Sequence, residues 1–122
     1  MSQLPRILVV DDDEIILTSL QHSLSTQGYD VVTARNGYDA LGIAKNQCLD
    51  LIISDIMLPD LSGLNLLSML KRFYLFKIPI IIISSLAQKD AAMPSIGLGA
   101  DDFFSKPIDY SRLSERVKSC LK

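Results

Sequence analysis

Five short apolar segments recur along the chain, separated by longer segments of mixed polarity. They are Ile7–Val10, Tyr29–Ala34, Leu51–Ser54, Ile78–Ile83 and Phe103–Ser105. The first, third and fourth are continuous rather than alternating, which is typical of parallel strands covered on both faces. We therefore predict five strands in a parallel sheet that is buried on both sides.

Apolar residues at helical spacing lie between the strands and after the last one. They are Ile16, Leu17, Leu20 and Leu24 in the first helix, Tyr38, Leu41 and Ala44 in the second, Leu64, Leu67 and Leu70 in the third, and Leu113, Val117 and Leu121 in the last. Gly28 stands where the first helix would end. Capping residues precede the other three, namely Asn36, Ser62 and Asp109.

The segment from Ala87 to Leu98 is the weakest helix candidate, because it contains Pro94 and Gly97. If Asp90 caps this helix, Pro94 falls in the first turn, where a missing N–H costs least. We expect a short or irregular helix here.

Strands that alternate strictly with helices imply right-handed crossovers and an α/β fold with a doubly wound parallel sheet. The 122 residues suit one domain over positions 1–122, and nearly half of them (48%) are apolar, which allows a buried core. In such sheets, ligands bind beyond the carboxyl ends of the strands. Functional side chains are therefore expected at that edge.

Charge and hydropathy exclude two classes of partner. The net charge is −2, so the domain as a whole offers no electrostatic footprint for nucleic acid. The longest apolar run, Ile78–Ile83, is far shorter than the ~20 residues that span a bilayer. Cys48 and Cys120 match no metal or redox spacing. We expect a soluble cytoplasmic protein with neither a membrane nor a nucleic acid as partner.

Polar residues with chemical potential follow four of the predicted strands. They are Asp11-Asp12-Asp13-Glu14, Asp55, Ser84-Ser85 and Lys106-Pro107. Each has an ordinary structural explanation, such as a helix cap for the acidic quartet, a turn residue for Asp55, or a solvated surface lysine for Lys106. The fold would nevertheless bring all four groups to one edge of the sheet.

Several carboxylates on one edge repel one another unless a cation is present. Oxygen ligands with octahedral geometry favour Mg²⁺. A neighbouring ammonium and hydroxyl would complete a phosphoryl-transfer site, and an aspartate can itself accept the phosphoryl group. The residues therefore predict an Mg²⁺-dependent phosphoryl site.

With these residues, the chain resembles the receiver domain of bacterial two-component response regulators over essentially its full length. The matching stretches are Ile7–Glu14, Leu51–Gly63, the strand that ends at Ser84, and Gly99–Pro107. Four motifs in order at the right distances make the resemblance specific. It implies a flavodoxin-like (βα)5 fold with strand order 2-1-3-4-5.

The resemblance also implies a role for each site residue. Asp55 is the phosphoacceptor, Ser84 the switch hydroxyl and Lys106 the cationic partner of the phosphoryl group. Mg²⁺, for which Mn²⁺ can substitute, is bound by Asp12, Asp55 and the main-chain carbonyl of Met57, with Asp11 acting through a water. Phe103 stands where the family places an aromatic that turns inward on activation.

The implied function is a phosphorylation-controlled switch that catalyses only its own phosphorylation and dephosphorylation, and not a metabolic enzyme. The donor is a sensor histidine kinase or a phosphotransfer protein. The fourth and fifth helices offer a face for an output domain, a downstream protein or a phosphorylation-dependent homodimer. The chain is either a complete regulator or the N-terminal part of a longer one, and the sequence does not name the kinase or the output.

Three departures from the family pattern affect the signalling expectations, and one of them is the presence of Pro94 and Gly97 in the helix that the family often uses as its output surface. Ser84 replaces the commoner threonine, and Phe103 replaces the frequent tyrosine, so an inward swing must be driven by packing alone. Met57 and Leu86 occupy positions from which family members help to hold the hydrolytic water, and neither has a strong hydrogen-bonding group. We therefore expect slow self-dephosphorylation.

Two alternatives remain open from the sequence. A phosphohydrolase of the haloacid-dehalogenase type also uses an aspartate on a parallel sheet, but Ile15 departs from its signature and Asp55 would be unexplained. A receiver-like interaction module that never takes phosphate is the other. Turnover of a small phosphate ester would favour the first alternative, and the absence of any phosphorylation would favour the second.

Overall fold

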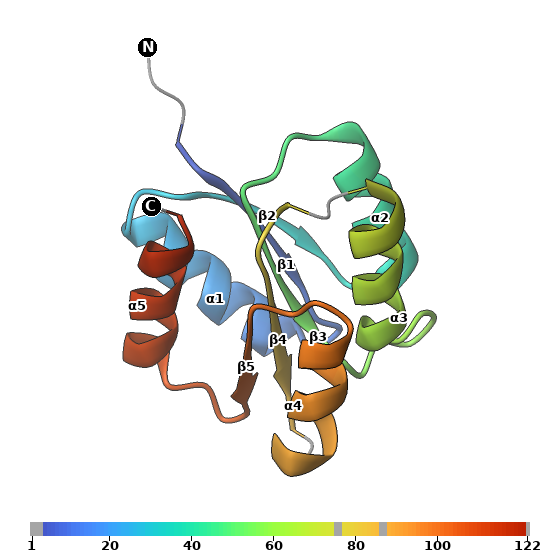
Figure 1. The fold of residues 1–122 in the computed structure, drawn as a ribbon. Helices are drawn as coiled ribbons and strands as arrows, with labels where there is room; N and C mark the ends of the chain where they lie inside the picture. Colours follow the sequence, from blue (N-terminus) through green and yellow to red (C-terminus); the bar gives the residue numbers. More distant parts are fainter. Residues whose placement is uncertain (1–3, 75–76, 86–87, 122) are drawn as a thin grey trace.

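The computed structural model describes residues 4–74, 77–85 and 88–121. Five parallel strands form one sheet in the order β2-β1-β3-β4-β5 (Figure 1). The strands are β1 (Arg6–Val10), β2 (Asp30–Ala34), β3 (Leu51–Asp55), β4 (Ile80–Ser84) and β5 (Asp102–Ser105). The predicted α/β fold and its strand order are therefore confirmed.

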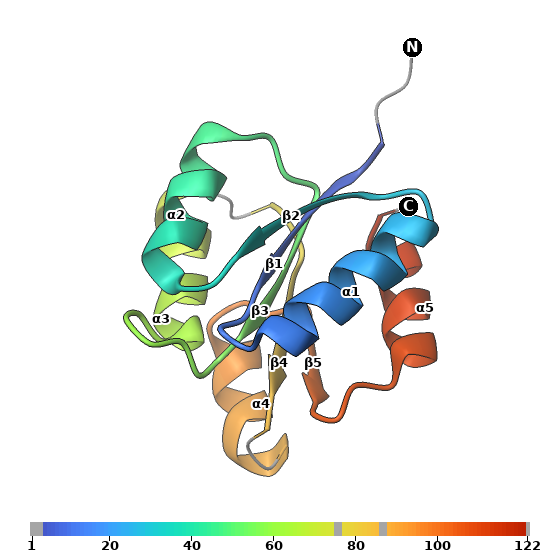
Figure 2. The same ribbon diagram turned by 180° about the vertical axis from the view of Figure 1, so that it is seen from behind.

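Helices cover both faces of this sheet, as the two opposite views in Figure 1 and Figure 2 show. On one face lie α1 (Glu14–Thr26) and α5 (Tyr110–Cys120). On the other lie α2 (Gly37–Asn46), α3 (Gly63–Met69) and α4 (Gln88–Gly97). A π-helical turn, η1 (Leu70–Tyr74), continues α3 and was not predicted.

The central strands are apolar throughout because both of their faces are covered. Every residue of β3 and β4 is buried, and so is every residue of β1 after Arg6. Alternate side chains point into two cores, with Ile7 and Val9 on the α1–α5 side and Leu8 and Val10 on the other. Each such side chain contributes about 1.5–3 kcal/mol on burial, so these strands hold the sheet edge in a fixed register.

Local capping explains where the helices begin. Each predicted cap accepts a backbone N–H from three residues along the chain, at 2.8 Å for Asn36, 3.1 Å for Ser62 and 3.2 Å for Asp109. Asp13, from the acidic quartet, caps α1. Gly28 adopts a φ of 94° just after α1, a left-handed conformation that favours glycine. These signals were readable from the sequence because they are local.

The predicted cap of α4 is wrong. This helix begins at Gln88, so Asp90 is already helical and Pro94 lies in the helix interior rather than in the first turn. The side chain of Asp90 lies outside the described part of the structure. Ala92 packs against the apolar core and Ser95 is fully buried. Packing of this face against the sheet outweighs the poor helix propensity of the segment.

The predicted inner face of α2 is partly wrong. Tyr38 is 60% exposed, whereas Ala40 and Ala44 are buried and Leu41 is partly buried. Small residues line the inner face, and at Gly37 the close approach of Leu61 leaves no room for a larger side chain. The apolar pattern alone could not reveal that approach.

Candidate functional site

The predicted polar residues lie at the carboxyl ends of four neighbouring strands. Asp11 follows β1, Asp55 ends β3, Ser84 ends β4 and Lys106 follows β5. All strands run parallel, so these ends lie at one edge of the sheet. The sheet therefore brings together groups that are far apart in the sequence.

A buried ion-pair cluster occupies this edge. Lys106 Nζ lies 2.9 Å from Asp11 Oδ2 and 3.0 Å from Asp55 Oδ2. The Asp11 side chain is 0% exposed, the Asp55 side chain 5% and the Lys106 side chain 18%. One ammonium group thus lies between two carboxylates that water hardly reaches.

Burial and hydrogen bonding set the charge state of this cluster. Burial raises the pKa of Asp11, the Asp55 carboxylate adds to the rise, and the Asp13 N–H and the Lys106 ammonium oppose it. Burial by itself lowers the pKa of Lys106, but the two carboxylates together outweigh it and raise that pKa above its ordinary value. The lysine is therefore held as a cation.

The charge of the cluster is incompletely balanced. Asp11, Asp12 and Asp55 each offer an oxygen, and these oxygens lie within 4.8 Å of one another. Within the described residues, Asp11 Oδ2 is buried and accepts no hydrogen bond, although it has Lys106 as an ion-pair partner. Three clustered carboxylates, of which two pair with a single ammonium, fit a hard divalent cation.

Backbone contacts orient the residues around Asp55. The Met57 N–H donates to Asp55 Oδ1 at 3.2 Å, and the Met57 side chain is exposed. Gly63 packs so closely on the chain after β3 that an added Cβ would lie 2.1 Å from the Asp55 carbonyl oxygen. Sequence reasoning did not assign Gly63 a role, although its place at the end of the Leu51–Gly63 motif was a signal.

Ser84 and Lys106 are joined through the main chain. Ser84 is fully buried at the end of β4, and its carbonyl accepts the Lys106 N–H at 2.8 Å. In the neighbouring strand pair, Asp55 is in register with Ile83, one residue before Ser84. The hydroxyl-bearing residue and the lysine are thus held in fixed positions next to the strand that carries Asp55.

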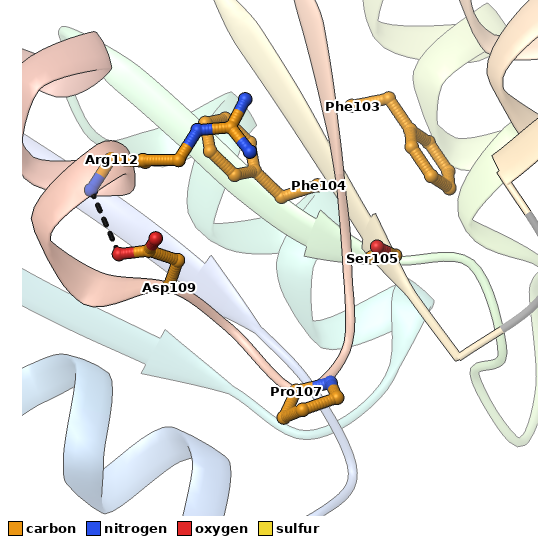
Figure 3. Close-up of a pocket in the computed structure, with 6 residues that line it drawn as sticks. All are labelled: Phe103, Phe104, Ser105, Pro107, Asp109 and Arg112. Atoms are coloured by element: carbon orange, nitrogen blue, oxygen red, sulfur yellow. Dashed lines mark hydrogen bonds between the residues drawn. The ribbon is translucent and has the colours of Figure 1, made fainter.

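The two aromatic residues of β5 point to opposite faces of the sheet, as Figure 3 shows. Phe103 is 7% exposed and belongs to the core under α2, α3 and α4, so its side chain is turned inward. Phe104 lies on the α5 face, where the Arg112 guanidinium is 5.8 Å from its ring centre. Leu86, the other residue expected to influence the phosphoryl lifetime, lies outside the described residues.

The structure therefore brings together Asp11, Asp12, Asp55 and Lys106, and places Ser84 and Met57 beside them. The roles assigned to these residues and to Phe103 stay predictions. Within the described part of the chain, each helix is too short or too polar to cross a membrane.

Comparisons with known proteins test the family assignment. Residues 7–118 match the model of the response regulator receiver domain. The chain is 39% identical over 117 residues to the alkaline phosphatase synthesis transcriptional regulatory protein PhoP of Bacillus subtilis, a match that covers 96% of this chain and 48% of that protein. It is 36% identical over 118 residues to the transcriptional regulatory protein PrrA of Mycobacterium tuberculosis, covering 97% of this chain and 50% of the relative.

Solved structures give the same result. A CheY-like response regulator receiver domain protein from Methanospirillum hungatei superposes with a TM-score of 0.92 at 33% identity, covering 98% of this chain and 94% of that one. The chain spans about half the length of the transcriptional regulators that it matches. The sequence motifs, the sheet order and these similarities agree, and the chain belongs to the response regulator receiver domain family.

Proposed function

We propose that Asp55 is the phosphoacceptor of an Mg²⁺-dependent signalling switch. A carboxylate oxygen of Asp55 would attack the phosphorus of a phosphohistidine or of acetyl phosphate. A new P–O bond to Asp55 forms as the bond from phosphorus to the donor nitrogen or oxygen breaks, and the donor leaves with that electron pair. The observation that carries this proposal is the buried contact of Asp55 and Asp11 with the single Lys106 ammonium.

Lys106 is well placed to neutralise a phosphoryl oxygen. Its ammonium lies 3.0 Å from Asp55 Oδ2, and its raised pKa keeps it charged. In the proposed reaction the ammonium would exchange part of its contact with Asp55 for a contact with an oxygen of the incoming phosphoryl group. It would then provide a fixed positive charge where negative charge develops in the transition state. The Ser84 hydroxyl would then donate a hydrogen bond to the phosphoryl group, and inward burial of Phe103 would accompany the active arrangement.

Asp11, Asp12, Asp55 and the Met57 carbonyl would hold Mg²⁺, or Mn²⁺ in its place. The bound cation supplies charge neutralisation that lets an anionic donor approach a cluster of carboxylates. The chain's own residues do the rest. Asp11 and Asp55 are held by the ends of β1 and β3. Lys106 is held by the hydrogen bond that its backbone N–H donates to the Ser84 carbonyl.

The partners follow from the family. A sensor histidine kinase or a phosphotransfer protein would supply the phosphoryl group to a cytoplasmic regulator. The relatives PhoP and PrrA are transcriptional regulatory proteins about twice as long as the matched region, so an output domain attached to this receiver domain is consistent with their architecture. The α4–β5–α5 face is the proposed output surface and, after phosphorylation, a homodimer surface. As a switch, the protein would turn over no small substrate.

Intact-mass measurement after incubation with acetyl phosphate tests the proposal. Wild type should gain one phosphoryl group with Mg²⁺ or Mn²⁺ and none in EDTA. Asp55→Asn should gain none, while the control Asp39→Asn, which changes an exposed carboxylate on α2, should behave as wild type. Equal incorporation by Asp55→Asn would refute the assignment. Steady release of phosphate from a simple ester would point to a phosphohydrolase, and no incorporation in any protein would point to an interaction module without phosphorylation.

A further inference from the structure

The carboxylate of Asp60 joins two segments that are distant in the sequence. Asp60 lies in the loop between β3 and α3, and its Oδ1 accepts the Gly37 N–H at 2.8 Å and the Leu61 N–H at 2.6 Å. Its Oδ2 accepts the Tyr38 N–H at 3.1 Å. Gly37 and Tyr38 are the first residues of α2, where backbone N–H groups lack partners within the helix. Asp60 therefore binds the start of α2 from another loop.

The loop that carries Asp60 also carries the Met57 main chain, and it is held at two places. At its base, the Ile56 carbonyl accepts the Gly63 N–H at 2.8 Å and the Leu58 N–H at 3.1 Å. At its far end, Asp60 is bonded to α2, and Leu61 lies against Gly37 so closely that a Cβ there would come within 2.6 Å of the Leu61 Cβ. Met57 stands between these two anchors.

Helix α2 does not need Asp60 as its cap. Asn36 already fills that role, because its Oδ1 accepts the Asp39 N–H at 2.8 Å. The Asp39 carboxylate in turn accepts the Asn36 side-chain amide at 2.9 Å. What Asp60 adds is thus a connection between the loop and the helix rather than the helix end itself. With both oxygens used by N–H donors, Asp60 is also poorly suited to bind a cation directly.

We infer that Asp60 is a positioning residue for the phosphoacceptor site, acting through the loop that holds Met57. By fixing the far end of the loop to α2, Asp60 limits the positions open to the Met57 main chain. Less conformational entropy is then lost when a cation binds. Because such coupling is reciprocal, cation binding should stabilise the contact between Asp60 and the start of α2. This inference rests on the proposed function.

A pair of variants separates this role from a general effect of charge. Asp60→Ala removes the contact with α2, and Asp39→Ala removes one negative charge from the same helix end without touching the loop. Mg²⁺ affinity, measured by titration calorimetry on the intact proteins with MgCl₂, should fall about tenfold in Asp60→Ala. Asp39→Ala should stay within about twofold of wild type. Asp60→Asn, which keeps one acceptor oxygen, should be intermediate and serves if the alanine variant fails to fold.

The dependence of amide hydrogen exchange on Mg²⁺ provides a second measurement, and a merely structural role of Asp60 would not produce such a dependence. In wild type and Asp39→Ala, adding Mg²⁺ should slow exchange of the Gly37 and Tyr38 N–H groups. In Asp60→Ala, their exchange should be fast and insensitive to Mg²⁺. Equal Mg²⁺ affinities for the Asp60 and Asp39 variants, or α2 amides that ignore Mg²⁺ in wild type, would overturn the inference alone. Failure of wild type to bind Mg²⁺ would overturn the proposed function with it.

Discussion

The carboxylates at the sheet edge and the carboxylate at the tip of the β3–α3 loop differ in how their charge is balanced. Asp11 is fully buried, shares Lys106 with Asp55 and keeps one oxygen without a hydrogen bond among the described residues. Asp60 is exposed, and backbone N–H groups surround its oxygens.

The pKa values of Asp11 and Asp60 are shifted in opposite directions for this reason. Burial raises the pKa of Asp11 more than its partners lower it. For Asp60 burial is the largest single influence and acts upward, but the N–H groups of Gly37, Tyr38 and Leu61 together outweigh it and lower the pKa. The comparison teaches that clustered carboxylates with too few cationic partners suit a further cation, whereas a carboxylate whose two oxygens both accept backbone N–H groups suits a structural joint.

The largest expected effect comes from removing the Lys106 ammonium, which pairs with the carboxylates at the sheet edge. Lys106→Met leaves two buried carboxylates unpaired, which should lower the free energy of unfolding by about 3 kcal/mol in EDTA. Urea unfolding measures this. Lys118→Met, at an exposed position of α5, is the control and should change little. A loss no larger than that of the control would mean that the edge carboxylates are not balanced by Lys106.

Adding Mg²⁺ should relieve much of the electrostatic repulsion between the carboxylates at the sheet edge. Binding to the folded state stabilises wild type by about 2.7 kcal/mol when the free Mg²⁺ concentration is a hundred times Kd. The melting temperature should therefore keep rising with the logarithm of the free Mg²⁺ concentration once that concentration exceeds Kd. Asp55→Asn should respond far less, because it lacks one of the proposed ligands. A melting temperature that millimolar Mg²⁺ does not move would contradict the cation site.

Met57 lies between the two regions, and its side chain should affect the lifetime of phospho-Asp55. Neither Met57 nor Leu86 can hold a hydrolytic water through a strong hydrogen bond. The double variant Met57→Asn, Leu86→Glu should therefore lose the phosphoryl group about tenfold faster, a barrier change of about 1.4 kcal/mol. Decay of the phosphorylated mass at fixed Mg²⁺ measures it. Equal decay in wild type would show that the shielding argument is wrong.

Asp55→Asn should stabilise the metal-free protein by about 1 kcal/mol, a smaller effect of opposite sign to Lys106→Met. The substitution removes one of three clustered carboxylates, of which only Asp11 and Asp55 pair with Lys106, and leaves Asp11 paired with that ammonium. Chemical unfolding in EDTA gives the difference. A destabilised variant would indicate that Lys106 already compensates Asp55 fully.

The smallest effect is a pair of opposite pH dependences. The folded-state pKa of Asp11 is raised above 3.8, so its ionisation removes stability as pH rises from 3.8 through the raised pKa. The pKa of Asp60 is lowered, so its contribution is present above 3.8 and is lost as pH falls through the lowered pKa.

These opposite slopes can be measured in EDTA. Relative to wild type, Asp11→Asn should gain stability as pH rises through the raised pKa of Asp11. Asp60→Asn should lose stability as pH rises from the lowered pKa to 3.8. Parallel profiles for the two variants would remove the distinction between the two regions.

Much of the fold was predictable because its signals are local. Continuous apolar runs marked the central strands, and the caps Asn36, Ser62 and Asp109 were read from single residues. The predictions that failed depended on packing. Pro94 lies inside α4, and Tyr38 turns to solvent, because neighbouring elements decide which face of a helix is covered.

The sequence by itself determined the strand–helix alternation, the family motifs and the residue types at each strand end. A parallel sheet must then gather those ends at one edge, so Asp11, Asp55 and Lys106 could be assigned to a common site before any distance was known. Only the tertiary structure decided how their charges are shared, and that Asp60 joins the loop after Asp55 to α2. Hydrogen bonds between residues 23 positions apart leave no periodic or local signal in the sequence, because they depend on how a loop and the start of a helix meet in space.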